Sequence, residues 1–67
     1  MYSNQIQQLL EDENIEVGDR VKVNSREGRL MPKPSSGNPE TIVLKLESGY
    51  NLGLEPENIE LIEKKDT

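Results

Sequence analysis

Residues 41–54 read T-I-V-L-K-L-E-S-G-Y-N-L-G-L, and this stretch decides the fold. Its apolar side chains alternate on both sides of a short polar break: Ile42, Leu44, Leu46, Tyr50, Leu52 and Leu54. Alternation with a period of two places side chains on one face of a strand. The break, Glu47-Ser48-Gly49, ends in glycine, which adopts a positive φ without steric cost. The stretch therefore predicts an antiparallel β-hairpin.

Three further strands are expected outside this hairpin, within residues 15–23, 27–31 and 59–62. In the first of them Val21 and Val23 face one way, while Arg20 and Lys22 face the other, which indicates a strand with one wet side. Gly28 and Gly53 are candidate positions for sharp bends.

Residues 32–40 read P-K-P-S-S-G-N-P-E, a composition that no strand ladder tolerates. We expect an exposed, mobile loop. Long loops often carry binding residues, but a merely solvated loop is an equally good interpretation.

A short amphipathic helix is predicted at the start of the chain, over residues 1–14. Ser3 or Asn4 can cap it, and Ile6, Leu9 and Leu10 form a narrow apolar stripe. A lone helix of this length is marginal in water, so it must dock. It either covers one end of its own sheet or packs on a partner.

These elements together predict a mainly β domain, a small five-stranded SH3-like barrel preceded by the helix. A sheet of five strands in so short a chain would expose its edges unless it bent towards closure. The domain divides into the helix (1–14), the barrel (15–62) and a charged tail (63–67) with no reason to be ordered. The predicted core is Val21, Val23, Leu30, Ile42, Leu44, Leu46, Leu52, Leu54, Ile59 and Leu61.

Composition argues against catalysis. The 67 residues include no cysteine and no histidine, so the commonest nucleophile-activating base and the commonest metal ligands are missing. No glycine-rich phosphate loop or calcium-loop spacing occurs either. We therefore predict no catalytic residue, no metal and no cofactor. No apolar run is long enough to cross a bilayer, and we expect a cytoplasmic protein.

Charge leaves one alternative open. A net charge of −5 disfavours generic binding to nucleic acid. Five of the eight basic residues nevertheless fall between positions 20 and 33, with Arg20, Lys22 and Arg29 as candidate RNA contacts. The more ordinary interpretation is a solvated face that balances acids elsewhere, since no aromatic stacking platform lies there.

Two stretches resemble a known family, E-G-R-L-M-P (27–32) and I-V-L-K-L-E-S-G-Y-N-L-G-L (42–54). They are similar to the N-terminal domain of GatD, a subunit of the archaeal glutamyl-tRNA(Gln) amidotransferase. The segment V-G-D-R-V-K-V (17–23) and the first ten residues also fit. The resemblance covers nearly the whole chain; it departs from the family in a shorter link before Glu27 and in Arg26, where an aromatic residue is common.

The resemblance implies a role in a larger enzyme. In the family an asparaginase-like region follows this domain and releases ammonia from glutamine, and the tRNA-binding subunit, GatE, uses that ammonia to convert Glu-tRNA(Gln) to Gln-tRNA(Gln). The implied partners are therefore the asparaginase-like domain and GatE, with direct tRNA contact left open and no membrane. The family's catalytic residues lie in the asparaginase-like region, so none transfers to this chain.

Our leading hypothesis is a non-catalytic accessory or assembly domain. Its candidate interface residues are Leu30, Met31, Pro32, Tyr50 and Asn51. The alternative is a stand-alone RNA-binding barrel of the SH3-like or KOW type, and a weaker third hypothesis is a barrel that grips a peptide.

Overall fold

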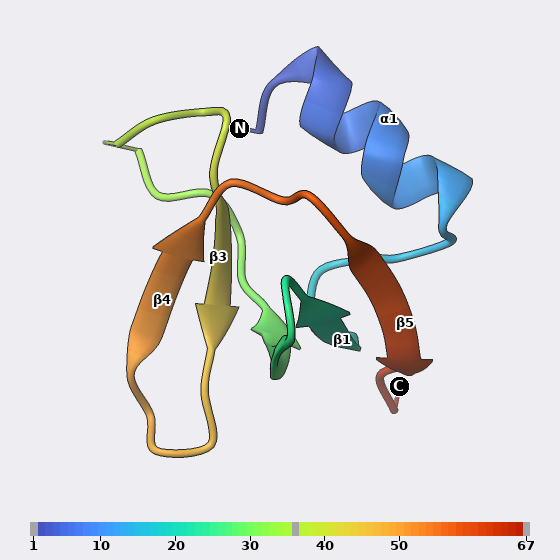
Figure 1. Ribbon diagram of the computed structural model, residues 1–67, viewed down its shortest axis with the longest axis vertical. Helices are drawn as coiled ribbons and strands as arrows, with labels where there is room; N and C mark the ends of the chain where they lie inside the picture. Colours follow the sequence, from blue (N-terminus) through green and yellow to red (C-terminus); the bar gives the residue numbers. More distant parts are fainter. Residues whose placement is uncertain (1, 36, 67) are drawn as a thin grey trace.

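A computed structural model describes residues 2–35 and 37–66, while Met1, Ser36 and Thr67 lie outside the described residues. Its elements are α1 (Asn4–Asp12), β1 (Arg20–Val23), β2 (Arg26–Leu30), β3 (Ile42–Lys45), β4 (Asn51–Leu54) and β5 (Ile59–Glu63). The predicted class, mainly β with one short N-terminal helix, is therefore confirmed. Figure 1 shows β3 and β4 side by side, β5 on the opposite side, and α1 across the top.

Local hydrogen bonds define both ends of α1. Ser3 is the N-cap, and its side chain accepts from the amide of Ile6 at 3.2 Å. At the other end Asn14 takes a left-handed φ of +57°, and the amide of Ile15 donates to the carbonyl of Leu10 at 2.8 Å. This is a Schellman-type ending in which asparagine replaces the usual glycine. The caps fix a helix of nine residues, shorter than the predicted fourteen.

The central hairpin forms as predicted. Its strands pair from Ile42 with Leu54 to Lys45 with Asn51. Gly49 has a φ of +93°, and its amide donates to the carbonyl of Leu46 at 2.8 Å. The preceding hairpin is tighter: Asn24 and Ser25 alone connect β1 to β2, with φ values of +49° and +73°. Two consecutive positive φ values are the signature of a type I′ turn, whose twist suits a hairpin.

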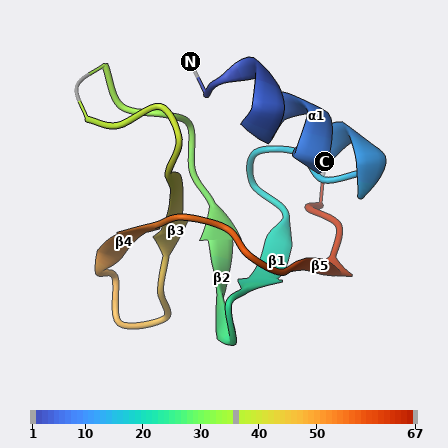
Figure 2. The ribbon, with the colours of Figure 1, turned by 45° about the horizontal axis from the view of Figure 1, so that its top comes forward.

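All five strands belong to one antiparallel sheet in the order β4-β3-β2-β1-β5. Closure into a barrel was expected, but β4 and β5 do not pair in the described part of the chain, so the sheet stays open there. The 55–58 connection crosses from β4 to β5, as the orange and red ribbon of Figure 2 shows.

One of the two predicted bends has a clear steric basis. A Cβ at Gly28 would lie 2.8 Å from the carbonyl oxygen of Lys45, so only glycine lets β2 approach β3 this closely. Only two residue pairs, Arg29 with Lys45 and Leu30 with Leu44, join these strands. At Gly53 a Cβ would meet nothing within 4 Å, so that glycine is not required for a bend.

The core contains more of the N-terminal segment than the sequence predicted. Its buried apolar side chains are Tyr2, Ile6, Leu10, Ile15, Val21, Val23, Leu30, Ile42 and Leu44. The first four come from the helix and its flanks, which confirms that α1 covers its own sheet. Of the ten predicted core residues, Leu46, Leu54, Ile59 and Leu61 are only partly buried against this cluster, and Leu52 is half-buried.

The chain beyond residue 62 differs from the expected disordered tail. Glu63 is the last residue of β5, and both Lys64 and Lys65 are hydrogen bonded to Asp19. Within residues 2–35 and 37–66, no helix is long and apolar enough to cross a membrane.

Candidate interaction surface

The first group of predicted interface residues lies at the end of β2. Leu30 is fully buried, so it is a core residue and cannot contact a partner. Met31 is half-buried, and its carbonyl accepts from the hydroxyl of Tyr2 at 2.6 Å. The same hydroxyl accepts from the amide of Val43 at 3.2 Å, which ties the N-terminal segment to β3. Pro32 is exposed, so of this group it is the residue most open to a partner.

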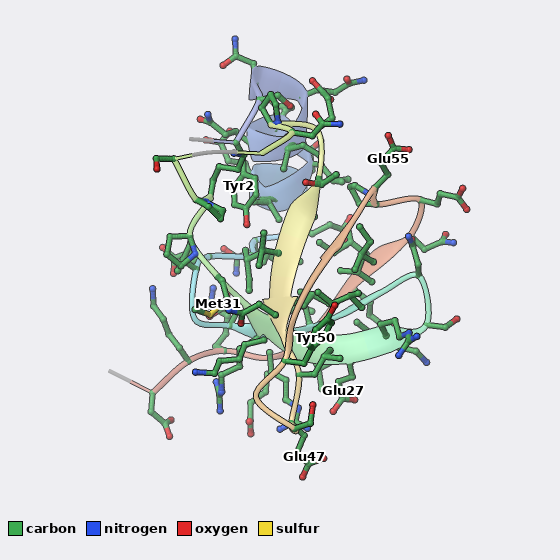
Figure 3. All side chains as sticks on the ribbon, turned by 90° about the vertical axis from the view of Figure 1, so that its left-hand side faces the viewer. Tyr2, Glu27, Met31, Glu47, Tyr50 and Glu55 are labelled. Atoms are coloured by element: carbon green, nitrogen blue, oxygen red, sulfur yellow. The ribbon has the colours of Figure 1, made fainter. Side chains whose placement is uncertain are left out.

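The second group lies at the tip of the central hairpin. Tyr50 is 63% exposed, and Asn51, the first residue of β4, is also exposed. Figure 3 labels Tyr50 and Met31 at separate places on the molecule. The amide of Met31 donates to the carbonyl of Val43, whereas the carbonyl of Tyr50 accepts from the amide of Leu46. Val43 and Leu46 are three positions apart in the chain, which corresponds to about 10 Å at a strand's rise per residue. The structure therefore does not unite the two groups.

The predicted basic residues share the outer face of the sheet, but acidic neighbours oppose two of them. Arg20 is directly opposite Arg29, and Arg29 is opposite Lys45, which gives a row of three cations across β1, β2 and β3. Sequence reasoning missed Lys45, because only the strand register places it there. Lys22 belongs to another row, between Glu27 and Glu60.

Two of these cations, Arg20 and Arg29, already form hydrogen bonds within the domain. The Nη2 of Arg20 lies 2.6 Å from Oε2 of Glu27, and this carboxylate raises the pKa of Arg20. Arg29 donates from Nη1 to the carbonyl of Gly18 at 3.0 Å. A groove of about 470 Å³ runs beside them, and it also contains Glu27 and Glu47. The outer face is therefore of mixed charge, with no continuous cationic track.

A buried carboxylate that the sequence analysis did not single out holds the C-terminal segment. Asp19 is fully buried, and its Oδ2 accepts from Nζ of Lys64 at 2.7 Å and from the amide of Glu16 at 2.8 Å. Its Oδ1 accepts from the amide of Lys65 at 2.9 Å. Burial alone would raise the pKa of Asp19, but these three donors and the charge of Lys64 lower it to about 2. The signal was present in the sequence, since Asp19 has the same strand parity as Val21 and Val23.

A second groove, of about 670 Å³, separates α1 from the 55–58 connection. Ile6 and Leu9 of the helix and Pro56 of the connection supply its apolar surface. Asp12, Glu40 and Glu55 bring carboxylates to it, and the remaining lining residues, Gln5 and Gln8, are neutral. The charged residues that line this groove are all acidic, whereas those of the outer-face groove are both acidic and basic.

No cluster of three or more histidine, cysteine, aspartate or glutamate residues suited to a metal ion occurs among the residues that the structure describes. The surface instead offers grooves, exposed apolar side chains and charge, which are features of binding.

Comparison with known proteins gives a consistent result. A family model described as the GatD N-terminal domain matches residues 15–64. The glutamyl-tRNA(Gln) amidotransferase GatD of Thermofilum pendens is 41% identical over 71 residues, covering 94% of this chain and 16% of that protein. The protein of the same name from Methanosphaera stadtmanae is 47% identical over 58 residues, covering 81% of this chain and 13% of that protein. The chain thus spans about a sixth of the length of the curated relatives it matches. It belongs to the family of GatD N-terminal domains.

Proposed function

We propose that this chain is a non-catalytic accessory domain of a tRNA-dependent amidotransferase, in which it supports the conversion of Glu-tRNA(Gln) to Gln-tRNA(Gln) in the cytoplasm. The observation that carries the proposal is the family match over residues 15–64, a range that contains all five strands and Asp19. The domain acts by helping the amidotransferase to assemble. Its partners are the asparaginase-like domain of GatD and the tRNA-binding subunit GatE.

The fold suits such a role. The strand order β4-β3-β2-β1-β5 and the bend at Gly28 support an SH3-like barrel in a partly open form. Three large apolar side chains, Val17, Tyr50 and Ile62, are more than 40% exposed, with Tyr50 the most exposed. Tyrosine is among the residue types that contribute most to binding energy at protein interfaces, so Tyr50 is the one of the three that a partner would contact. Met31, Pro32, Tyr50 and Asn51 remain candidate contacts in this proposal, whereas Leu30 is withdrawn because it is fully buried.

A domain exchange tests the proposal. In GatD of Methanosphaera stadtmanae, the segment that aligns with this chain is deleted, or it is replaced by this chain. Formation of Gln-tRNA(Gln) is then measured after reconstitution with GatE. We expect the deletion to lose most activity and the replacement to restore it, while an unrelated domain of equal length does not. The isolated chain should show no glutaminase turnover.

Two results would end the proposal. One is a deletion variant that is folded and fully active, because the domain would then contribute nothing to the enzyme. The other is glutamine hydrolysis by the isolated chain, which would make it catalytic.

The alternative of a stand-alone RNA-binding barrel has weaker support. Glu27 pairs with Arg20, and Glu27 and Glu60 flank Lys22, so phosphates would have to displace or approach carboxylates. We expect no chemical-shift change at Arg20, Lys22 or Arg29 when the chain is titrated with tRNA at low salt. Salt-sensitive shifts at these residues would revive the alternative.

A further inference from the structure

The groove between α1 and the 55–58 connection has walls that the fold holds in place. On one side, Asn24 donates from Nδ2 to the carbonyl of Glu55 at 2.6 Å. Its Oδ1 accepts from the amides of Glu57 and Asn58 at 2.8 and 3.0 Å. A single side chain from the β1–β2 turn thereby fixes the shape of the connection.

The other wall is α1, which is anchored independently. Ile6 and Leu10 are buried in the core, and the amide of Ser3 donates to the carbonyl of Pro39 at 3.1 Å. Leu9 lies beside these residues, but it is only half-buried and lines the groove. The groove therefore exists before any ligand arrives, and its volume of about 670 Å³ is that of a ligand-sized site.

The charge of the groove has one sign. Its lining includes the carboxylates of Asp12, Glu40 and Glu55 and contains no lysine or arginine. The nearest polar partner of Asp12 is the neutral Nε2 of Gln8, at 3.0 Å. No basic residue occurs between Lys45 and Lys64, a stretch with five glutamates, nor in α1; around Glu40 the nearest basic residues in the sequence are Lys45 and Lys33. Figure 3 shows the Glu55 side chain pointing away from the sheet.

The groove combines an apolar floor with a rim of carboxylates, and this combination indicates which class of ligand it can bind. Anionic surfaces such as nucleic acid or lipid headgroups are repelled. A metal ion lacks a cluster of three ligands among the described residues. An apolar side chain flanked by cations satisfies both parts of the groove, because it covers Leu9 and Pro56 and brings positive charge to the rim.

We propose that this groove is a docking site for a basic protein segment that carries leucine-like side chains between lysines or arginines. This inference does not depend on the proposed function, since it follows from the groove and its charge alone. The experiment below involves no amidotransferase, so its failure and the failure of the domain exchange are separate results.

Three synthetic hexapeptides test the chemistry on the isotope-labelled chain. The first is Lys-Leu-Lys-Lys-Leu-Lys, the second replaces leucine by serine, and the third replaces lysine by glutamate. We expect saturable amide shifts at Leu9, Glu40 and Glu55 with the first peptide only, and an affinity that falls as salt is added. Equal binding of the serine or glutamate peptide, or no binding of the first peptide, overturns the proposal.

Variants locate the site. Glu55→Gln and Glu40→Gln each remove one rim charge, and each should weaken binding of the lysine–leucine peptide about 1.5- to 5-fold, as exposed charge pairs do. Leu9→Gln preserves helix propensity but removes the apolar contact, and it should weaken binding by a similar factor. Glu60→Gln is the matched control, since it removes the same charge from the outer face of β5.

A control variant that weakens binding as much as Glu55→Gln would show that net charge, not the groove, attracts the peptide. Circular dichroism of each variant confirms that it is folded before titration. If groove amides shift with protein concentration in the absence of peptide, a second copy of the chain occupies the groove and the proposal is wrong.

Discussion

Replacing Asp19 by asparagine should remove a large part of the stability of this small domain. The carboxylate is fully buried and accepts three hydrogen bonds, from the amides of Glu16 and Lys65 and from Nζ of Lys64. Asparagine keeps the size of the side chain, but one of its terminal atoms becomes a donor. That amide group must then face groups that also donate, and the charge that holds Lys64 is lost.

The magnitude follows from the pKa of Asp19. Lowering it from an ordinary value of 3.8 to about 2 corresponds to roughly 2–3 kcal/mol of free energy of unfolding at neutral pH. A core of this size supplies only about 3–5 kcal/mol in all. We therefore expect Asp19→Asn to lower the urea midpoint by about half at pH 7, or to leave the chain largely unfolded at 37 °C.

The sign of the pH dependence is fixed by the direction of this pKa. Because the pKa of Asp19 is lower in the folded state than in the unfolded state, its contribution is complete above about pH 5 and is lost as the pH falls through 2. Roughly half of this contribution should remain at pH 3, and only a small part of it at pH 2. The difference between wild type and Asp19→Asn should shrink accordingly.

Urea unfolding followed by circular dichroism at several pH values measures this difference. Asp66→Asn is the matched control, because it makes the same chemical change at an exposed position in the same segment. A variant as stable as wild type at pH 7, where the pKa implies a loss of roughly 2–3 kcal/mol, would refute the reasoning. So would a stability difference that does not change between pH 7 and pH 2.

Three further substitutions test other parts of the fold by the same unfolding measurement. Tyr2→Phe removes the hydroxyl that donates to Met31 and accepts from Val43, and it should cost about 1–3 kcal/mol; an unchanged urea midpoint would mean that these bonds do not form. Gly28→Ala places a Cβ 2.8 Å from the carbonyl oxygen of Lys45, so we expect a loss of about 1–3 kcal/mol, whereas Gly53→Ala, where a Cβ meets nothing, is its control. Ser25→Gly should raise the free energy of unfolding by about 0.5 kcal/mol. Glycine adopts the left-handed φ of +73° without strain, and this gain exceeds the extra entropy that it gives to the unfolded chain. A decrease in stability would contradict the turn assignment.

The sequence was most informative where structure is local. Alternation in residues 41–54 and the glycine at position 49 predicted the central hairpin, and both strands form there. Periodicity and capping residues also predicted α1, and alternation predicted strand β1, which contains Lys22. Each of these features depends on residues within a few positions of one another, so a pattern in the chain records it directly.

What the sequence did not reveal depends on contacts between distant segments. Asp19 meets Lys64 across 45 positions, and the hydroxyl of Tyr2 reaches Met31 and Val43 from the start of the chain. The row of Arg20, Arg29 and Lys45 requires the register of three strands. Closure of the sheet was expected from the need to hide edges, but β4 and β5 do not pair in the described part of the chain, and side chains of α1 join the core instead. The acidic groove lies between α1 and the 55–58 connection, and its lining residues come from segments that share no sequence motif.

The anchorage of Lys64 and Lys65 on Asp19 also decides how the molecule responds to mechanical tension. A pull on the chain beyond Lys65 reaches the Asp19 side chain before it reaches β5, because both lysines bond to that carboxylate. The bond from the charged Nζ of Lys64 is charge-assisted, and such bonds are shorter and stronger than neutral ones. These bonds must break before the pull separates β5 from β1 pair by pair, and through Asp19 the tension also reaches the turn at Glu16.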